Sequence, residues 1–151
     1  MEARMANPAY LVADAMEPLQ ALAAATRTGG VPASTLAFVH LRASQINGCE
    51  LCIDLASREL KETAETDERL FSVARWRDAN CFTDAERAAL ALSESMTRLS
   101  DDGAGVSDEV WDEAARHYSE SELAALVLSI ATGNLWNRIN VTTRQPVGAA
   151  W

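Results

Sequence analysis

Two cysteines stand three residues apart, at Cys49 and Cys52, directly after the pair Asn47-Gly48. Asn-Gly favours a turn and residues 53–60 continue in a helical pattern, so both thiols lie where a turn gives way to a helix. The free N–H groups and the dipole at a helix N-terminus favour the thiolate, which is the nucleophilic form of cysteine. The spacing also lets the two sulfurs form an easily reduced disulfide. The motif therefore predicts a dithiol that cycles between reduced and oxidised forms.

Two other interpretations of the pair compete with redox chemistry. Cys-x-x-Cys is half of a zinc site, but the other soft ligands are Cys81, His40 and His117, and none of them forms a second closely spaced pair. We therefore predict no metal site. The two cysteines could also be small buried hydrophobic residues, since free cysteine is among the most buried residue types. This second interpretation stays open beside the redox one.

The composition is that of an ordinary globular chain, with 151 residues of which 48% are apolar, enough for one domain that spans residues 1–151. Its net charge of −9, with no basic stripe, argues against nucleic acid and anionic membranes as partners. Three cysteines make no disulfide scaffold and residues 1–13 lack the apolar core of a signal peptide, so we expect a reducing cytoplasm. Because the chain has no Gly-rich phosphate loop, we expect no cofactor.

Helix punctuation predicts the elements that position the dithiol. Asn7-Pro8 is a cap followed by proline at the first helical position, Pro18 marks a break or restart, and Gly29-Gly30 ends this short helical pair. A new helix is predicted to begin after Val31-Pro32, and apolar residues at helical spacing then lead to the Asn47-Gly48 turn. These residues are Leu36, Val39, Ala43 and Ile46. The helix that they predict leads directly into the dithiol.

Capping boxes at Thr83–Glu86 and Ser119–Glu122 open two further helices. The first is expected to reach Leu99 and to be followed by a loop over 100–105. The second runs from Leu123 to about Asn140, and its apolar run is far shorter than the ~20 residues that a bilayer requires, so it is predicted to be a buried central helix. No segment alternates with period two. We therefore predict an all-α, single-domain helical bundle of about seven helices.

Gly133 interrupts this apolar helix, where glycine costs ~1 kcal/mol relative to alanine and usually marks a close backbone approach or a vacated pocket. Asn134, Asn137 and Arg138 follow it closely. Polar groups on a buried helix need partners, so these three residues form either a satisfied network behind the dithiol or part of an interface. We favour the structural network.

Three strings of the sequence carry a resemblance to a known family. They are His40-Leu41-Arg42-Ala43-Ser44-Gln45-Ile46-Asn47-Gly48-Cys49 with Cys52, Phe82-Thr83-Asp84-Ala85-Glu86-Arg87, and Asn134-Leu135-Trp136-Asn137-Arg138. The chain resembles, over about residues 20 to 145, the carboxymuconolactone decarboxylase and alkylhydroperoxidase D superfamily, and most of all its small actinobacterial-type alkylhydroperoxidase-like members. The resemblance implies an all-helical subunit that assembles into a homo-oligomer, a trimer or hexamer, with peroxidase activity through the cysteine pair.

The resemblance also implies a role for each cysteine. In the family, the cysteine that matches Cys52 attacks the peroxide and becomes a sulfenic acid, the one that matches Cys49 resolves it as a disulfide, and a dithiol reductant restores the pair. A glutamate and a histidine deprotonate the attacking thiol, and this chain has Ala37 and Ala56 at those positions. Such groups typically contribute 10²–10⁴-fold in rate, so we expect impaired peroxide reduction. His40 is a candidate substitute base, or else a hydrogen-bonded core or interface residue.

Several positions that depart from the family pattern carry smaller side chains than expected. Ala37, Ala56 and Gly133 all remove volume, and we expect them to carve a pocket at the dithiol together with Cys81, which also departs from the pattern. They fit a natural member that has diverged towards another ligand or an engineered variant of a natural scaffold. Two functional classes follow: a peroxiredoxin-type peroxidase or disulfide oxidoreductase of reduced competence, and a binding or assembly scaffold for another small-molecule ligand.

Overall fold

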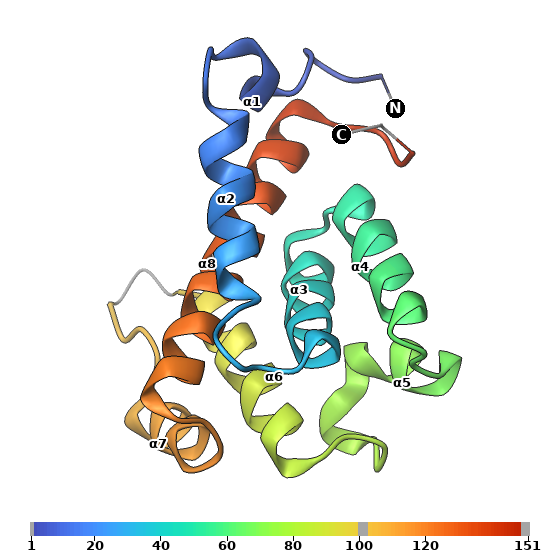
Figure 1. Ribbon diagram of the computed structural model, residues 1–151. Coiled ribbons are helices and arrows are strands. Elements are labelled where there is room, and N and C mark those ends of the chain that lie inside the picture. Colours follow the sequence, from blue (N-terminus) through green and yellow to red (C-terminus); the bar gives the residue numbers. More distant parts are fainter. Residues whose placement is uncertain (1, 100–102, 149–151) are drawn as a thin grey trace.

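The computed structural model describes residues 2–99 and 103–148 and folds them into eight α-helices and one 3-10 helix (Figure 1). These are α1 (Pro8–Leu11), α2 (Met16–Thr26), α3 (Ala33–Asn47), α4 (Glu50–Glu62), α5 (Asp67–Ser72), η1 (Val73–Asp78), α6 (Asp84–Thr97), α7 (Asp108–His117) and α8 (Glu120–Thr143). The predicted all-α fold is confirmed. The sequence pattern did not indicate α5 or η1, because elements of six residues are too short for an apolar periodicity to stand out.

The helices begin where local capping signals place them. The Asn7 side chain caps α1, whose first residue is Pro8, and α6 and α8 each open with a complete capping box, Thr83 with Glu86 and Ser119 with Glu122. Gly48 ends α3 in the left-handed conformation, with φ of 67°, which a residue without Cβ adopts without strain. The turn at Gly48 sets the start of α4, and with it the position of both cysteines.

Two helices differ in length from the sequence-based expectation. Helix α6 ends at Thr97 rather than Leu99, and α8 continues to Thr143, beyond the expected end near Asn140. Of the loop expected over 100–105, residues 100–102 lie outside the described part of the chain. Within the described part, no helix is long and apolar enough to cross a membrane.

Helix α3 lies at the centre of the bundle and packs against α4, α6 and α8, while α2 runs along α8 (Figure 1). Two apolar clusters form around α3. The first joins α3 to α6, α7 and α8 and contains Val31, Leu36, Val39, Ala89, Leu92, Ala114, Tyr118, Leu123, Ala125, Leu126 and Ile130. The second joins α3 to α4, η1 and α6 and contains Ala37, Phe38, Leu41, Ala56, Leu60, Val73, Trp76, Phe82 and Leu90. Because both faces of α3 are buried, its side chains hold fixed positions relative to α4 and α8.

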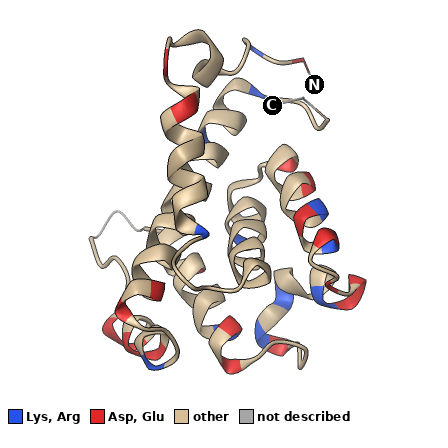
Figure 2. Ribbon diagram, viewed as in Figure 1, with Lys and Arg blue, Asp and Glu red and all other residues tan. Residues whose placement is uncertain are grey.

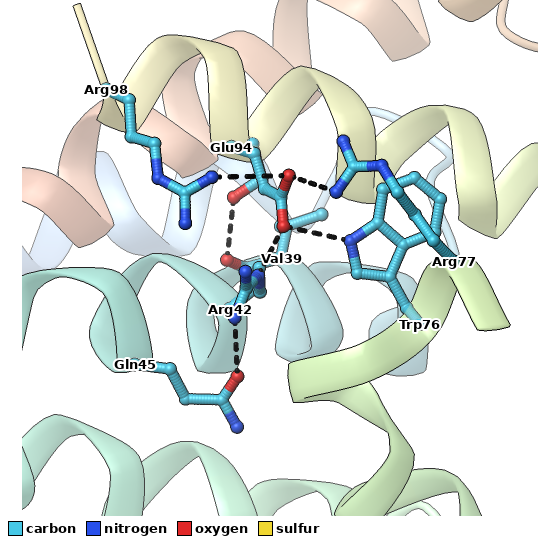
Figure 3. Close-up of polar contacts among 8 residues, drawn as sticks. Val39, Arg42, Gln45, Trp76, Arg77, Glu94 and Arg98 are labelled. Atoms are coloured by element: carbon cyan, nitrogen blue, oxygen red, sulfur yellow. Dashed lines mark hydrogen bonds and ion pairs between the residues drawn. The ribbon is translucent and has the colours of Figure 1, made fainter. Parts of the chain in front are cut away.

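Charged residues gather on α4 to α7, whereas α3 and the middle of α8 carry few (Figure 2). One charged group inside the bundle is Glu94 on α6, a 4% exposed carboxylate that accepts hydrogen bonds from Arg42 at 2.6 Å, Trp76 at 3.1 Å and Arg77 at 2.5 Å (Figure 3). Burial raises the pKa of Glu94, but the bonds from Arg77, Trp76 and Arg42 together lower it by more, so the net shift is downward. This ionised group ties α3, η1 and α6 together.

Candidate functional site

Cys49 and Cys52 form a disulfide at the N-terminus of α4, with their Cα atoms 5.3 Å apart. Cys49 is the N-cap residue, and its Sγ accepts a hydrogen bond from the backbone N–H of Cys52 at 3.3 Å. Cys49 is 2% exposed, whereas Cys52 is partly exposed. The bonded pair favours dithiol chemistry over two separately packed apolar cysteines, and Cys52 carries the more accessible sulfur.

A pocket of about 250 Å³ opens beside Cys52, enclosed by α2, α3, α4 and α8. Helix α4 contributes Cys52, Ala56 and Glu59 to its wall, α3 contributes His40, and α8 contributes Gly133. The other lining residues are Met16, Gln20, Ala23, Ser44, Leu55, Thr132, Trp136, Asn137 and Asn140. The pocket thus combines a reactive sulfur, one imidazole and one carboxylate within largely apolar walls.

The imidazole of His40 is hydrogen-bonded to Ser129 of α8. Its Nε2 lies 3.0 Å from the backbone oxygen of Ser129 and 2.9 Å from Ser129 Oγ. A carbonyl oxygen only accepts, so Nε2 carries the proton and Nδ1 carries the lone pair. Burial is the main influence on this group and lowers the pKa of His40, while the bond to Ser129 and the charge of Glu59 oppose that shift by less. The ring is therefore neutral at neutral pH.

Glu59 borders the same pocket and is paired with Arg27 at the end of α2, with Arg27 Nη1 2.6 Å from Glu59 Oε1. The Glu59 side chain is 23% exposed. Glu59 lies two turns along α4 from Cys52, so this ion pair lies near the part of the pocket away from the disulfide.

Asn140 contacts the sulfur directly. Its Nδ2 donates a hydrogen bond to Cys52 Sγ at 3.3 Å, and its Oδ1 accepts one from Asn7 Nδ2 at 3.4 Å. Sequence reasoning missed this residue. The available signal was the recurrence of asparagine at every third position of an apolar helix, at Asn134, Asn137 and Asn140.

The expected polar network lies behind the dithiol. Asn47 Nδ2 donates to Asn134 Oδ1 and Asn137 Oδ1, both at 2.9 Å, and Asn137 in turn donates to Ser44 Oγ at 3.0 Å. Arg138 Nη1 donates to Asn134 Oδ1 at 3.1 Å. These bonds join the turn before the disulfide to α8, as the favoured structural role requires.

The pocket differs from the expected one in two residues. Ala56 and Gly133 line it, but Ala37 and Cys81 do not: Ala37 is fully buried in the second apolar cluster, and Cys81 packs against that cluster. Ala37 and His40 lie three residues apart on α3, but only His40 lines the pocket, while Ala37 packs in the core. The space over Gly133 is not vacant either, because the His40 ring occupies it.

A second, open cavity of about 460 Å³ has Cys49 in its lining. Its lining residues include Cys49, Gly48 and the segment from Arg144 to Val147, and Asn140 borders both cavities. The two cysteines of the disulfide therefore line different cavities. In the described part of the chain, no group of three or more His, Cys, Asp or Glu residues is arranged to hold a metal ion.

Comparison with known proteins places this site in a family. The model of the carboxymuconolactone decarboxylase family matches residues 12–95. The uncharacterised protein YdfG of Bacillus subtilis (strain 168) is 33% identical over 116 residues, which cover 77% of this chain and 78% of its own length.

Two solved structures are also similar. One is a protein of unknown function from Agrobacterium tumefaciens, described as a candidate antioxidant defence protein AhpD, with a TM-score of 0.89 and 26% identity over 99% of this chain and 100% of its own. The debrominase Bmp8 shares the fold alone, with a TM-score of 0.79 and 22% identity over 90% of this chain and 72% of its own. With more than half of its length matched and the dithiol in place, this chain belongs to the carboxymuconolactone decarboxylase family, in its alkylhydroperoxidase D-like superfamily.

Proposed function

We propose that the protein is a thiol peroxidase that reduces a small organic or inorganic peroxide with Cys52 and then closes the disulfide with Cys49. One observation carries the proposal: the Cys52 sulfur lies in a pocket wall, accepts a hydrogen bond from Asn140, and is already bonded to the buried Cys49. Family membership supports the same chemistry. The alkylhydroperoxidase D-like fold provides this site on a rigid pair of helices, α4 and α8.

The reaction balances with a dithiol as the reductant. The Cys52 thiolate attacks one peroxide oxygen, so that an S–O bond forms, the O–O bond breaks and an alcohol or water leaves with a proton. The Cys49 sulfur then attacks the sulfenic acid, the S–O bond breaks, water leaves and the disulfide forms. The two thiols have lost two electrons to the peroxide. An external dithiol restores them by thiol–disulfide exchange and becomes a disulfide itself.

Two features of the site favour the thiolate of Cys52. The N-terminus of α4 adds partial positive charge, and the Asn140 amide donates to the sulfur. Ala37 and Ala56 offer no proton acceptor at the positions of the family relay. A general base typically contributes 10²–10⁴-fold, so without another base in the pocket the protein would be a slow peroxidase.

We propose that the external dithiol reaches the disulfide through the cavity that borders Cys49. This cavity of about 460 Å³ is open and lies on the other side of Asn140 from the Cys52 pocket. In this proposal the reductant and the peroxide approach the disulfide from different cavities. Attack on Cys49 releases the Cys52 thiolate, which is the form needed for the next turnover.

Peroxide consumption with dithiothreitol as reductant tests the proposed function. Cys52→Ser is expected to abolish turnover and Cys49→Ser to allow one oxidation without disulfide closure. Cys81→Ser is the matched control, because Cys81 is the free cysteine and lies outside the pocket. Equal rates for the unaltered protein and Cys52→Ser would remove the peroxidase function.

A second candidate function is the binding of an apolar small molecule without chemistry. The observation in its favour is the mainly apolar pocket wall, which includes Met16, Leu55 and Trp136. A ligand specific to the folded state must raise its thermal stability by mass action. Thermal-shift screening of the Cys52→Ser protein separates this function from redox chemistry: a ligand that stabilises this variant supports the binding function, and no stabilisation across the screen counts against it.

A further inference from the structure

We infer that His40 is the general base that deprotonates Cys52, and that Gly133 and Ser129 are positioning residues that hold its imidazole in the pocket. The inference deepens the proposed peroxidase function and rests on it. It assigns the proton transfer to a histidine of α3, which packs against both the cysteine helix α4 and the central helix α8.

The pocket brings the required groups together. His40 on α3 and Cys52 on α4 line the same cavity of about 250 Å³, and Ala56, one turn after Cys52, lines it with only a methyl group. A larger side chain at Ala56 would compete with the imidazole for this space. The pocket is large enough to hold water between the two groups, so a proton can pass from the thiol to the ring through one water molecule.

Gly133 is the residue that makes room for the ring. A Cβ placed there would lie 3.0 Å from His40 Cδ2 and 3.5 Å from His40 Nε2. The first separation is shorter than an ordinary carbon–carbon contact of about 3.5 Å, so a side chain at this position would require the imidazole to shift. Glycine is otherwise unfavourable in the interior of a 24-residue helix. The close approach to His40 explains why it stands there.

Ser129 sets the proton state of the ring. Its backbone oxygen accepts a hydrogen bond from Nε2–H at 3.0 Å, which leaves the lone pair on Nδ1. The charged groups near the ring are Glu59 on α4 and its partner Arg27 on α2, while the pocket residues that α8 contributes carry no charge. Burial outweighs these influences and lowers the pKa of His40, so the base is unprotonated at neutral pH.

The proton follows a closed path. Nδ1 of His40 takes up the proton of the Cys52 thiol through the bridging water, and the resulting thiolate attacks the peroxide. As the O–O bond breaks, the imidazolium returns this proton to the departing oxygen, which leaves as an alcohol or as water. The ring is neutral again before Cys49 closes the disulfide.

Single-turnover oxidation of the reduced protein by cumene hydroperoxide, followed by stopped flow between pH 5 and 9, tests the assignment. His40→Asn is expected to lower the rate at pH 7.5 by 10²-fold or more and to leave a rate that rises with pH only as the Cys52 thiol itself ionises, without the acid limb that protonation of the imidazole should give the unaltered protein. His117→Asn is the matched control, because His117 is the other histidine, lies on α7 and pairs with the surface residue Glu113. It should leave rate and profile unchanged. Added imidazole should restore part of the rate of His40→Ala.

Gly133→Ala provides an independent test should His40→Asn fold poorly. It keeps both cysteines and the histidine but displaces the ring. The oxidation rate should therefore fall at least tenfold, and its dependence on pH in acid should change. If His40→Asn reacts with the rate and pH profile of the unaltered protein, His40 is not the base, and if Gly133→Ala does so, Gly133 is not a positioning residue. That result leaves the peroxidase function in place as long as Cys52→Ser is inactive. An unaltered protein that reacts no faster than Cys52→Ser overturns both.

Discussion

Asn140 donates a hydrogen bond to the sulfur of Cys52 across 3.3 Å, although 88 residues separate them in the sequence. The amide is oriented by Asn7, whose Nδ2 donates to Asn140 Oδ1 at 3.4 Å and so leaves the NH₂ group directed at the sulfur. Asn140 is 3% exposed. A buried donor next to a thiol stabilises the charged form more than the neutral form, so this contact should make Cys52 more acidic.

Replacement of Asn140 should therefore leave less of the Cys52 thiol ionised at neutral pH. Asn140→Leu keeps a similar volume and removes the hydrogen bond, and we expect Cys52 to be alkylated about tenfold more slowly at neutral pH, since hydrogen bonds to charged groups contribute ~1.5 kcal/mol or more. The measurement is the pH dependence of iodoacetamide alkylation. A Cys49→Ser, Cys81→Ala background leaves Cys52 as the single thiol.

Asn137→Leu is the control for this experiment. It removes another buried amide from the same helix, one that donates to Ser44 Oγ at 3.0 Å rather than to the sulfur. Both variants should lose stability, but only Asn140→Leu should change the alkylation profile. Superimposable profiles for the two variants would show that the contact has no influence on Cys52.

The close contact between Gly133 and His40 predicts that substitutions at these two positions have non-additive effects on the free energy of unfolding. Gly133→Ala should gain ~1 kcal/mol from helix propensity when His40 has been replaced by alanine, because nothing then occupies the space. In the presence of His40, the added Cβ would lie 3.0 Å from Cδ2, and this gain should vanish or reverse. Urea unfolding of the four proteins of this double-mutant cycle gives the coupling, which we expect to exceed ~0.5 kcal/mol. Additive effects would mean that the ring moves aside freely.

His40 and Glu94 predict how stability depends on pH. The pKa of His40 is lower in the folded state than its ordinary value of 6.5, so the unfolded chain takes up this proton first and stability falls as the pH drops below about 6.5. The pKa of Glu94 is also lowered, from 4.5, so its contribution is complete above that value and is lost as the pH falls below it. Urea midpoints between pH 8 and 3 should decrease in two stages. His40→Gln should remove the upper stage, and its persistence would assign that loss to other groups.

The carboxylate of Glu94 should be a major source of stability. Glu94→Ala leaves Arg42, whose side chain is 12% exposed, and the buried Trp76 indole without their acceptor, and we expect a loss of about 3 kcal/mol. Asp54→Ala removes the exposed pair with Arg58 and should change the free energy of unfolding by less than ~0.5 kcal/mol. Chemical denaturation of both variants makes the comparison. Similar small losses would show that the other arginine contacts compensate.

Much of the local structure follows from the sequence. Asn7, the two capping boxes and Gly48 start or end helices through contacts within a few residues, so their effects are visible in a short window. The same holds for the Cys49–Cys52 pair, whose spacing at a helix start brings the sulfurs together without help from other elements. The assembly into trimers or hexamers, the cytoplasmic location and the absence of a cofactor stay predictions.

The composition of the pocket depends on the packing of the helices. The sequence alone determined an all-helical chain of this family with a dithiol at a helix N-terminus. Only the tertiary structure decided that Ala37 faces the core, that His40 fills the space over Gly133, and that Asn140 reaches Cys52. The physical reason is that these contacts join residues about 90 positions apart on different helices. They depend on how α3, α4 and α8 are rotated against one another, which is fixed by side-chain packing over the whole bundle.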